Sequence, residues 1–306
     1  MFQRPLPLLA TVAALALMPA AAFAAAPKVV TSIKPLNSLV ASVMQGVGEP
    51  SLIVDGAASP HTYSLKPSNA QALQDADVVF WTGPGLELFL EKPLEALTDK
   101  ATVSEMDKAP GVETLKFRVG GPFEADDDGD QDTPGGIDPH LWLDPMNAKA
   151  MAAEIERVLV AADPDNAARY EENASALMAS LDALNTEIEA ELAPVKDTPF
   201  VVFHDAYQYF EHRYGVNVAG SVVVEPEAMP GAERLTKIHE KLETLGAACV
   251  FAEPEFESKL IKTVMEGTKA RTGTLDPLGA DLKNGPDLYF ELMRNMATSM
   301  KTCLEG

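Results

Sequence analysis

The sequence predicts an α/β protein of two lobes, each a mostly four-stranded parallel sheet flanked by helices, joined by one long helix. Short apolar and β-branched runs alternate with helical stretches in the first half of the chain, and the same scheme returns in the second half. Such alternation is typical of parallel sheets with helices on their faces. A stretch with one helical apolar stripe separates the two halves. At 306 residues, the chain is long enough for two domains.

The N-terminal lobe is expected over residues 25–162. Its four buried strands are expected at Lys28–Ile33, Ser51–Asp55, Val78–Thr82 and Thr102–Met106. Helices fit between these strands at Pro35–Met44 and Ser68–Asp75. Ser68 and Asn69 supply a start signal for the second of these helices.

The linker is expected over residues 163–194, with a helix at Pro164–Leu192. Its apolar residues recur every three or four positions, at Tyr170, Ala174, Leu177, Leu181, Leu184, Ile188 and Leu192. Asp163 is a natural N-cap, Pro164 suits the first helical position, and Ala193-Pro194 ends the helix. A helix of roughly 29 residues is about 43 Å long and would resist large hinge bending between the lobes. The competing interpretation is the seam of a coiled-coil dimer; we expect a monomer.

The C-terminal lobe is expected over residues 195–306. Its strands are expected at Phe200–His204, Val216–Val224, Ala248–Glu253 and Thr272–Asp276. Its helices are expected at Ala232–Leu245, Ser258–Arg271 and Pro286–Cys303.

The first 24 residues are typical of a cleaved export signal. Arg4 gives a positive start, Leu6–Met18 an apolar stretch, and Ala22-Phe23-Ala24 a cleavage site. The apolar run is too short, and too interrupted by proline, for a good membrane span. No cysteine lies at the cleavage point, so we expect no lipid anchor and a protein free in the bacterial periplasm.

The two cysteines, Cys249 and Cys303, favour a disulfide, because an even pair in an oxidising compartment is usually bonded. The bond would close a loop of about 55 residues and contribute about 4 kcal/mol in the chain-entropy model. Two buried free thiols are the alternative.

The acidity of the chain excludes one class of partner. A formal net charge of -22 repels phosphate backbones, so we expect no nucleic-acid partner. Part of the charge is concentrated in an acidic loop at about residues 120–136, with carboxylates from Glu124 to Asp132. An EF-hand Ca²⁺ loop does not fit there, because Gly135 stands where a bidentate Glu is required. A solvated linker and a weak collector of cations both remain open.

Three histidines lie where a ligand site is expected. His61 follows the second strand and His204 ends the fifth, and ligand sites of open α/β sheets collect at such strand ends. His140 comes directly after the acidic loop, and Glu253 and Asp276 end two further strands. Three neutral imidazoles with a carboxylate or a water suit Zn²⁺, whereas manganese prefers more oxygen ligands. Three unrelated loop histidines are the alternative; His212 and His239 are expected at the surface.

Four motifs in order resemble a known family from about residue 28 to the C-terminus. They are Gly56-Ala57-Ala58-Ser59-Pro60-His61-Thr62-Tyr63-Ser64-Leu65-Lys66-Pro67-Ser68, Asp138-Pro139-His140-Leu141-Trp142-Leu143-Asp144-Pro145, His204-Asp205-Ala206-Tyr207 and Leu275-Asp276-Pro277-Leu278-Gly279. They resemble the zinc-specific periplasmic substrate-binding proteins of bacterial ABC uptake transporters, which have a rigid linker helix.

The resemblance implies a receptor that captures Zn²⁺ between its lobes and delivers it to a cognate ABC permease in the membrane. It carries over His61, His140 and His204 as zinc ligands. Asp276 matches a carboxylate ligand of manganese relatives and of some zinc members; in others, water or a Glu completes the site. Pro60 stands where some zinc members have that Glu.

Other positions bear on the choice of metal. His204 stands where manganese relatives tend to have Glu, which favours zinc. The cysteine pair also resembles one found in part of the zinc branch. Zinc members commonly have histidines in the acidic loop, and this chain has none there, which slightly favours a harder cation.

The residues are expected to act as ligands of a transported ion, so we do not expect an enzyme. A manganese or iron receptor of the same fold is the first alternative. A zinc hydrolase is the second; it would need a metal-bound water beside a general base, for which Glu225 or Glu253 could serve.

Overall fold

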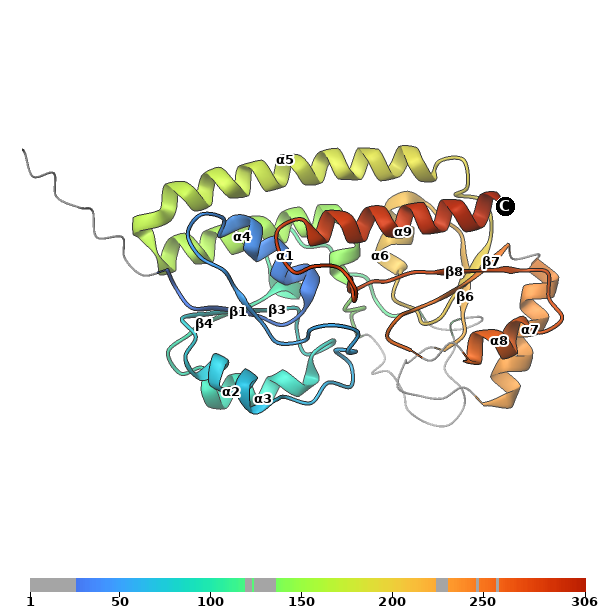
Figure 1. The fold of residues 1–306 in the computed structure, drawn as a ribbon, viewed down its shortest axis with the longest axis horizontal. Helices are drawn as coiled ribbons and strands as arrows, with labels where there is room; N and C mark the ends of the chain where they lie inside the picture. Colours follow the sequence, from blue (N-terminus) through green and yellow to red (C-terminus); the bar gives the residue numbers. More distant parts are fainter. Residues whose placement is uncertain (1–25, 119–122, 124–135, 224–230, 246–247, 257–258) are drawn as a thin grey trace, which may run out of the picture.

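The computed structural model describes residues 26–118, 123, 136–223, 231–245, 248–256 and 259–306. The predicted export signal, nearly all of the acidic loop and Glu225 lie outside these residues. In the described part, the chain forms two four-stranded sheets whose strands are all parallel. Figure 1 shows the two sheets side by side beneath a long helix, as the predicted fold class requires.

The N-terminal sheet has the strand order β2-β1-β3-β4. Its strands are β1 (Val29–Thr31), β2 (Ser51–Leu52), β3 (Val78–Trp81) and β4 (Thr102–Glu105). The central strands β1 and β3 are wholly buried, in keeping with their continuous apolar runs. All four strands lie within the predicted ranges.

The C-terminal sheet repeats this arrangement in the order β6-β5-β7-β8. Its strands are β5 (Phe200–Val202), β6 (Val218–Ser221), β7 (Cys249–Ala252) and β8 (Arg271–Thr274). In both sheets, the first strand in the chain therefore lies between the second and the third. The connection to the second strand and the connection to the third strand therefore run to opposite sides of the first strand. A crevice that can hold a ligand forms at the carboxyl end of a strand in this position.

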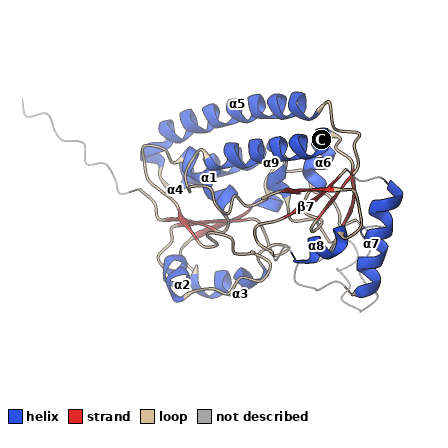
Figure 2. Cartoon of the chain, turned by 45° about the vertical axis from the view of Figure 1, so that its right-hand side comes forward, coloured by secondary structure: helices blue, strands red, loops and turns tan. Residues whose placement is uncertain are grey.

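Helices cover both faces of each sheet (Figures 1 and 2). One side carries α1 (Lys34–Val43), α4 (Pro145–Ala162), α5 (Ala167–Leu192) and α9 (Leu288–Glu305). The opposite side carries α2 (Pro67–Gln74) and α3 (Leu88–Leu97) under the N-terminal sheet, and α7 (Ala232–Leu245) and α8 (Lys259–Met265) under the C-terminal sheet. The short α6 (Gln208–Tyr214) follows β5.

The long helix α5 spans both sheets, and its apolar stripe lies in the protein core. All seven predicted stripe residues are buried, and the helix packs against α4, α9 and α1 of the same chain. The coiled-coil interpretation of this stripe is therefore wrong, because the side chains that would form the seam are already covered.

Two predicted helix boundaries are wrong. The segment Pro164–Asn166 forms a 3₁₀ turn, and the α-helix begins only at Ala167. Asp163 precedes the 3₁₀ turn and not α5, and its side chain makes no capping hydrogen bond to the backbone; its carboxylate accepts hydrogen bonds from Asn166 and Tyr170. The helix expected at Ser258–Arg271 is reduced to α8, because Gly267 adopts a left-handed φ of 83° and β8 already begins at Arg271.

The predicted disulfide is confirmed. Cys249 in β7 is bonded to Cys303 in α9, which ties a central strand of the C-terminal sheet to the helix that covers it. Among the described residues, no helix has both the length and the apolar character that crossing a membrane requires.

Candidate metal centre

The structure brings the three predicted histidines together. His61 lies in the loop after β2, His140 precedes the 3₁₀ turn Leu141–Leu143, and His204 follows β5. One ring nitrogen of each lies within 4.8 Å of those of the other two. The Nε2 atoms of His140 and His204 are 3.4 Å apart. Nitrogens gathered at this spacing can share one metal ion; that they do so stays a prediction.

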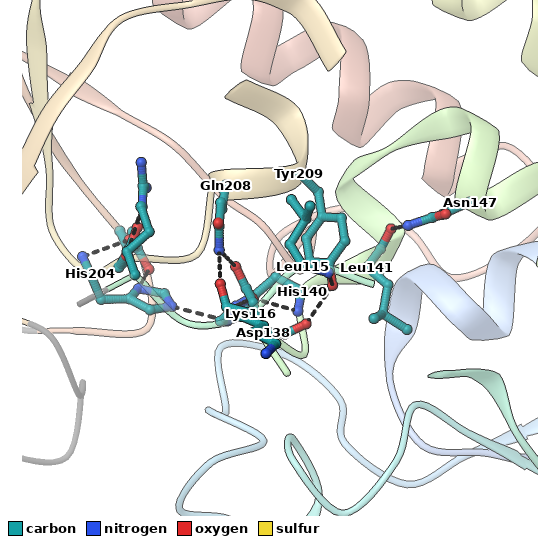
Figure 3. A network of polar contacts seen from close by, with 12 residues as sticks. Leu115, Lys116, Asp138, His140, Leu141, Asn147, His204, Gln208 and Tyr209 are labelled. Atoms are coloured by element: carbon teal, nitrogen blue, oxygen red, sulfur yellow. Dashed lines mark hydrogen bonds and ion pairs between the residues drawn. The ribbon is translucent and has the colours of Figure 1, made fainter. Parts of the chain in front are cut away.

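His140 is held by a carboxylate two residues before it (Figure 3). Oδ1 of Asp138 lies 2.8 Å from Nδ1 of His140 and accepts a hydrogen bond of 3.0 Å from the His140 backbone N–H. When Nδ1 carries the proton of the neutral ring, Nε2 presents its lone pair to the cluster. The side chain of His140 is buried, so this orientation is shielded from water.

Asp138 is itself fixed by the C-terminal lobe. Gln208 at the start of α6 donates to Oδ2 of Asp138 at 3.0 Å and to the Lys116 carbonyl at 3.0 Å (Figure 3). Tyr209 donates to the Asp138 carbonyl at 2.8 Å and accepts from the Leu115 N–H. The segment that carries His140 is thus anchored to the helix that follows His204.

His204 has a second buried carboxylate behind it. Its Nδ1 lies 2.7 Å from Oε2 of Glu253, and its backbone N–H donates to Oε1 at 3.4 Å. Burial by itself lowers the pKa of the His204 ring, but Glu253, with Asp205 and Asp138, outweighs burial and raises that pKa above its usual value. The contact again directs Nε2 toward the cluster.

The third histidine differs in its electrostatics. Burial lowers the pKa of His61 well below its usual value, and the neighbouring rings of His140 and His204 lower it further. Its backbone N–H donates to Oγ of Ser59 at 3.3 Å. A neutral His61 is the form that binds a metal.

The three rings line a small cavity with mostly apolar walls. Besides the histidines, the wall has an apolar part and three residues with side-chain oxygens: Pro60, Leu86, Trp142, Phe256, Pro277 and Leu278, and Ser59, Glu253 and Glu255. About 10 Å³ is open to the centre of a water-sized sphere. That space suits one water molecule or one small ion.

The structure places Asp276 differently from the histidines. Its Oδ1 accepts hydrogen bonds from the backbone N–H groups of Leu278 and Gly279, and its Oδ2 from that of Ala280, at 2.6 to 3.1 Å. It is not part of the described cluster of three histidines. Its role as a fourth ligand stays a prediction.

Sequence reasoning missed several residues that shape the site. Asp138 carried a signal, because it stands two residues before His140 in one motif. Gln208 and Glu255 carried none. Burial, Glu253 and Asp276 raise the pKa of the Glu255 carboxyl to about 9. Of the histidines expected at the surface, His212 is exposed and His239 is partly exposed, with Nδ1 3.1 Å from the Val264 carbonyl.

Contacts between two motifs join the lobes beside the cavity. Trp142 donates from Nε1 to the Pro277 carbonyl at 2.7 Å, and Tyr289 donates to the Trp142 carbonyl at 2.7 Å. Nζ of Lys34, a buried lysine of the N-terminal lobe, donates to the carbonyls of Ala280 and Leu282 at 2.9 and 2.8 Å. These bonds hold the connection between β8 and α9 against the N-terminal lobe.

Comparison with known proteins gives consistent matches over almost the whole chain. Residues 29–303 match the family described as zinc-uptake complex component A periplasmic. The high-affinity zinc uptake system protein ZnuA of Brucella abortus (strain 2308) is 54% identical over 304 residues, covering 90% of this chain and 91% of that protein. The protein of the same name from Yersinia pestis is 35% identical over 290 residues, covering 90% and 91%.

Solved structures agree with these matches. A crystal structure of ZnuA is similar with a TM-score of 0.78 and 26% identity, covering 91% of this chain and 99% of that chain. A zinc-bound ZnuA from which a segment was deleted has a TM-score of 0.76 and 28% identity, covering 91% and 98%.

Proposed function

Because the chain belongs to the family of periplasmic zinc-uptake component A proteins, we propose that it captures one Zn²⁺ between its lobes and delivers it to an ABC permease. His61, His140 and His204 bind the ion through ring nitrogens. The observation that carries this proposal is the convergence of three ring nitrogens on a cavity of about 10 Å³.

The carboxylates behind the rings prepare them for binding. Asp138 faces Nδ1 of His140 at 2.8 Å and Glu253 faces Nδ1 of His204 at 2.7 Å, which aims Nε2 of both rings toward the cavity. Zn²⁺ requires neutral imidazoles, and the lowered pKa of His61 keeps the third ring neutral. The two negative charges also offset part of the cost of placing a dication in a buried site.

The donor set supports zinc over a harder cation. Three imidazole nitrogens suit Zn²⁺, whereas Mn²⁺ prefers a larger share of oxygen ligands. A receptor also fits the site better than a hydrolase does. Glu253, the described candidate for a general base, already faces Nδ1 of His204, and the histidines line a cavity of only about 10 Å³.

The periplasm is the compartment that fits the remaining features. Disulfides such as Cys249–Cys303 persist in oxidising compartments, and the family is periplasmic by description. We propose that residues 1–24 direct export and that the mature protein acts as a monomer.

The proposal is tested by calorimetric titration of metal-free protein with Zn²⁺ at neutral pH. We expect one zinc per chain, with strongly weakened binding in His61→Ala, His140→Ala and His204→Ala. Wild-type affinity in all three variants would contradict the proposed site. Metal analysis of protein purified from the periplasm without nickel resin distinguishes a zinc receptor from a manganese or iron receptor.

A further inference from the structure

The fourth position on the zinc ion has several candidate donors, and the structure separates them. We propose that Glu255 supplies the fourth ligand, an inference that rests on the proposed function. Zn²⁺ in proteins takes tetrahedral sets of sulfur, imidazole nitrogen and carboxylate oxygen. The donor must therefore lie in the wall of the cavity that the three histidines line.

Three side chains in that wall carry oxygen: Ser59, Glu253 and Glu255. Ser59 has a neutral hydroxyl, which is not among the usual zinc ligands, and its Oγ already accepts the His61 N–H. Both oxygens of Glu253 face His204, one the ring and one the backbone N–H. Using Glu253 as a ligand would remove the group that orients His204.

Asp276 is engaged outside the wall of this cavity. Its two oxygens accept three backbone hydrogen bonds from residues 278–280, and these bonds shape the turn that leads to the contacts of Lys34. Turning the carboxylate toward the ion would leave buried N–H groups without partners, which costs about 1–3 kcal/mol for each group.

Glu255 has the opposite character. Both of its carboxylate oxygens are buried, and neither has a hydrogen bond of good geometry within the described part of the chain. Oε2 of Glu253 also has no such hydrogen bond, but it faces Nδ1 of His204 at 2.7 Å. Like Asp276, Glu255 lies outside the group of ring nitrogens within 4.8 Å of one another, so its side chain must turn toward the ion to bind it. A buried acceptor without a partner is costly, and a bound cation would satisfy it. Glu255 also lies beside Glu253 and Asp276, so a dication at this place relieves repulsion between carboxylates.

The backbone on either side of Glu255 forms a turn that packs against His204. The N–H of Phe256 donates to the Glu253 carbonyl at 3.4 Å, which folds residues 253–256 into a turn. The Phe256 ring packs edge-on against His204 with centroids 5.7 Å apart, and it stacks on Phe203. One turn thus places Glu253 behind the His204 ring, Phe256 on its face and Glu255 in the cavity wall.

The test compares Glu255→Gln with Asp276→Asn, using exposed Glu266→Gln as the matched control. Zinc affinity is measured by competition with a chelator at neutral pH, and thermal melts of the metal-free proteins check folding. Replacement of groups that only support a ligand weakens metal binding about 10- to 100-fold. We expect Glu255→Gln to lose more than about 100-fold, beyond that range, Asp276→Asn to lose less, and Glu266→Gln to bind as the wild type does.

A crystal structure of the zinc-loaded wild type supplies the second readout. We expect a Glu255 oxygen at about 2.0–2.2 Å from the ion. A water or an Asp276 oxygen in that position, or wild-type affinity in Glu255→Gln, would overturn the assignment while leaving the receptor function intact. Absence of zinc from the three histidines would instead overturn the proposed function itself.

Discussion

Replacement of Glu253 by glutamine is a sharp probe of how the protein holds its metal-binding histidines. The change is nearly isosteric and removes one charge at a side chain that is 4% exposed, 2.7 Å from Nδ1 of His204. The amide oxygen can still accept the Nδ1–H, so the ring keeps its orientation while the bond loses its charge assistance. The variant therefore isolates the electrostatic contribution of the carboxylate.

The expected loss follows from hydrogen-bond energies. Bonds to charged groups contribute about 1.5–3 kcal/mol and neutral ones about 0.5–1.5 kcal/mol, so the replacement removes about 1–1.5 kcal/mol. A bound zinc ion makes the Nδ1–H more acidic, so this loss falls mainly on the zinc-bound state. The zinc affinity of Glu253→Gln should be roughly tenfold below that of the wild type at pH 8, at the lower end of the range for supporting groups.

The pH dependence gives a second, independent signature. In the wild type, the raised pKa of His204 lets a proton compete for Nε2, so affinity is complete above that pKa and is lost as pH falls through it. Glutamine removes the main cause of the rise, so loss of affinity in the variant begins at a lower pH. The tenfold difference should therefore shrink as the solution becomes acidic.

The assay is chelator competition over pH 5.5–8, with melts of both metal-free proteins as a folding control. Glu266→Gln, an exposed substitution of the same kind, should follow the wild type. An affinity equal to that of the wild type at pH 8, or a ratio that stays constant down to pH 5.5, would show that the Glu253 charge does not support zinc binding through His204.

Three further predictions follow from the same contacts. Replacement of each of His61, His140 and His204 by alanine should weaken zinc binding more than about 100-fold, beyond the range for supporting groups, in calorimetric titrations; a loss under tenfold at any of them would remove that residue from the ligand set. The double variant Cys249→Ala/Cys303→Ala should lose about 4 kcal/mol of unfolding free energy in urea, because the bond closes a loop between residues 54 positions apart; identical urea midpoints for oxidised and reduced wild type would argue against this. Lys34→Met should lower the unfolding free energy by about 2 kcal/mol, because the carbonyls of Ala280 and Leu282 lose a charged donor; an unchanged urea midpoint would contradict that.

Much of the fold could be predicted because its signals are local. The buried runs at β1, β3, β5 and β7 are continuous apolar stretches, and the stripe on α5 repeats every three or four residues. α3 was missed, since it contains Pro93. α4 was also missed, because its alanine-rich sequence distinguishes the buried face from the exposed face less clearly. The periodicity of α5 does not say which partner covers its apolar stripe. Packing against helices of the same chain and packing against a second copy both require the same spacing of apolar residues.

The candidate site was predictable only in part. The rule that ligands gather at strand ends indicated His61 and His204. His140 does not directly follow a strand in the described part of the chain, and only its motif indicated it. Asp276 also lies just beyond a strand, yet its carboxylate is turned to the backbone of the next residues, as Asp side chains often are in turns. The pairing of Glu253 with His204 and of Gln208 with Asp138 joins residues 49 and 70 positions apart, which no local pattern encodes.

We propose above that one zinc ion binds among three histidines contributed by both lobes. Diffraction data collected from zinc-loaded crystals on both sides of the zinc absorption edge locate the ion without any assumption about its ligands. We expect one strong anomalous peak at about 2.0–2.1 Å from a ring nitrogen of each of His61, His140 and His204. A peak bound elsewhere on the chain, with none among these rings, would contradict it.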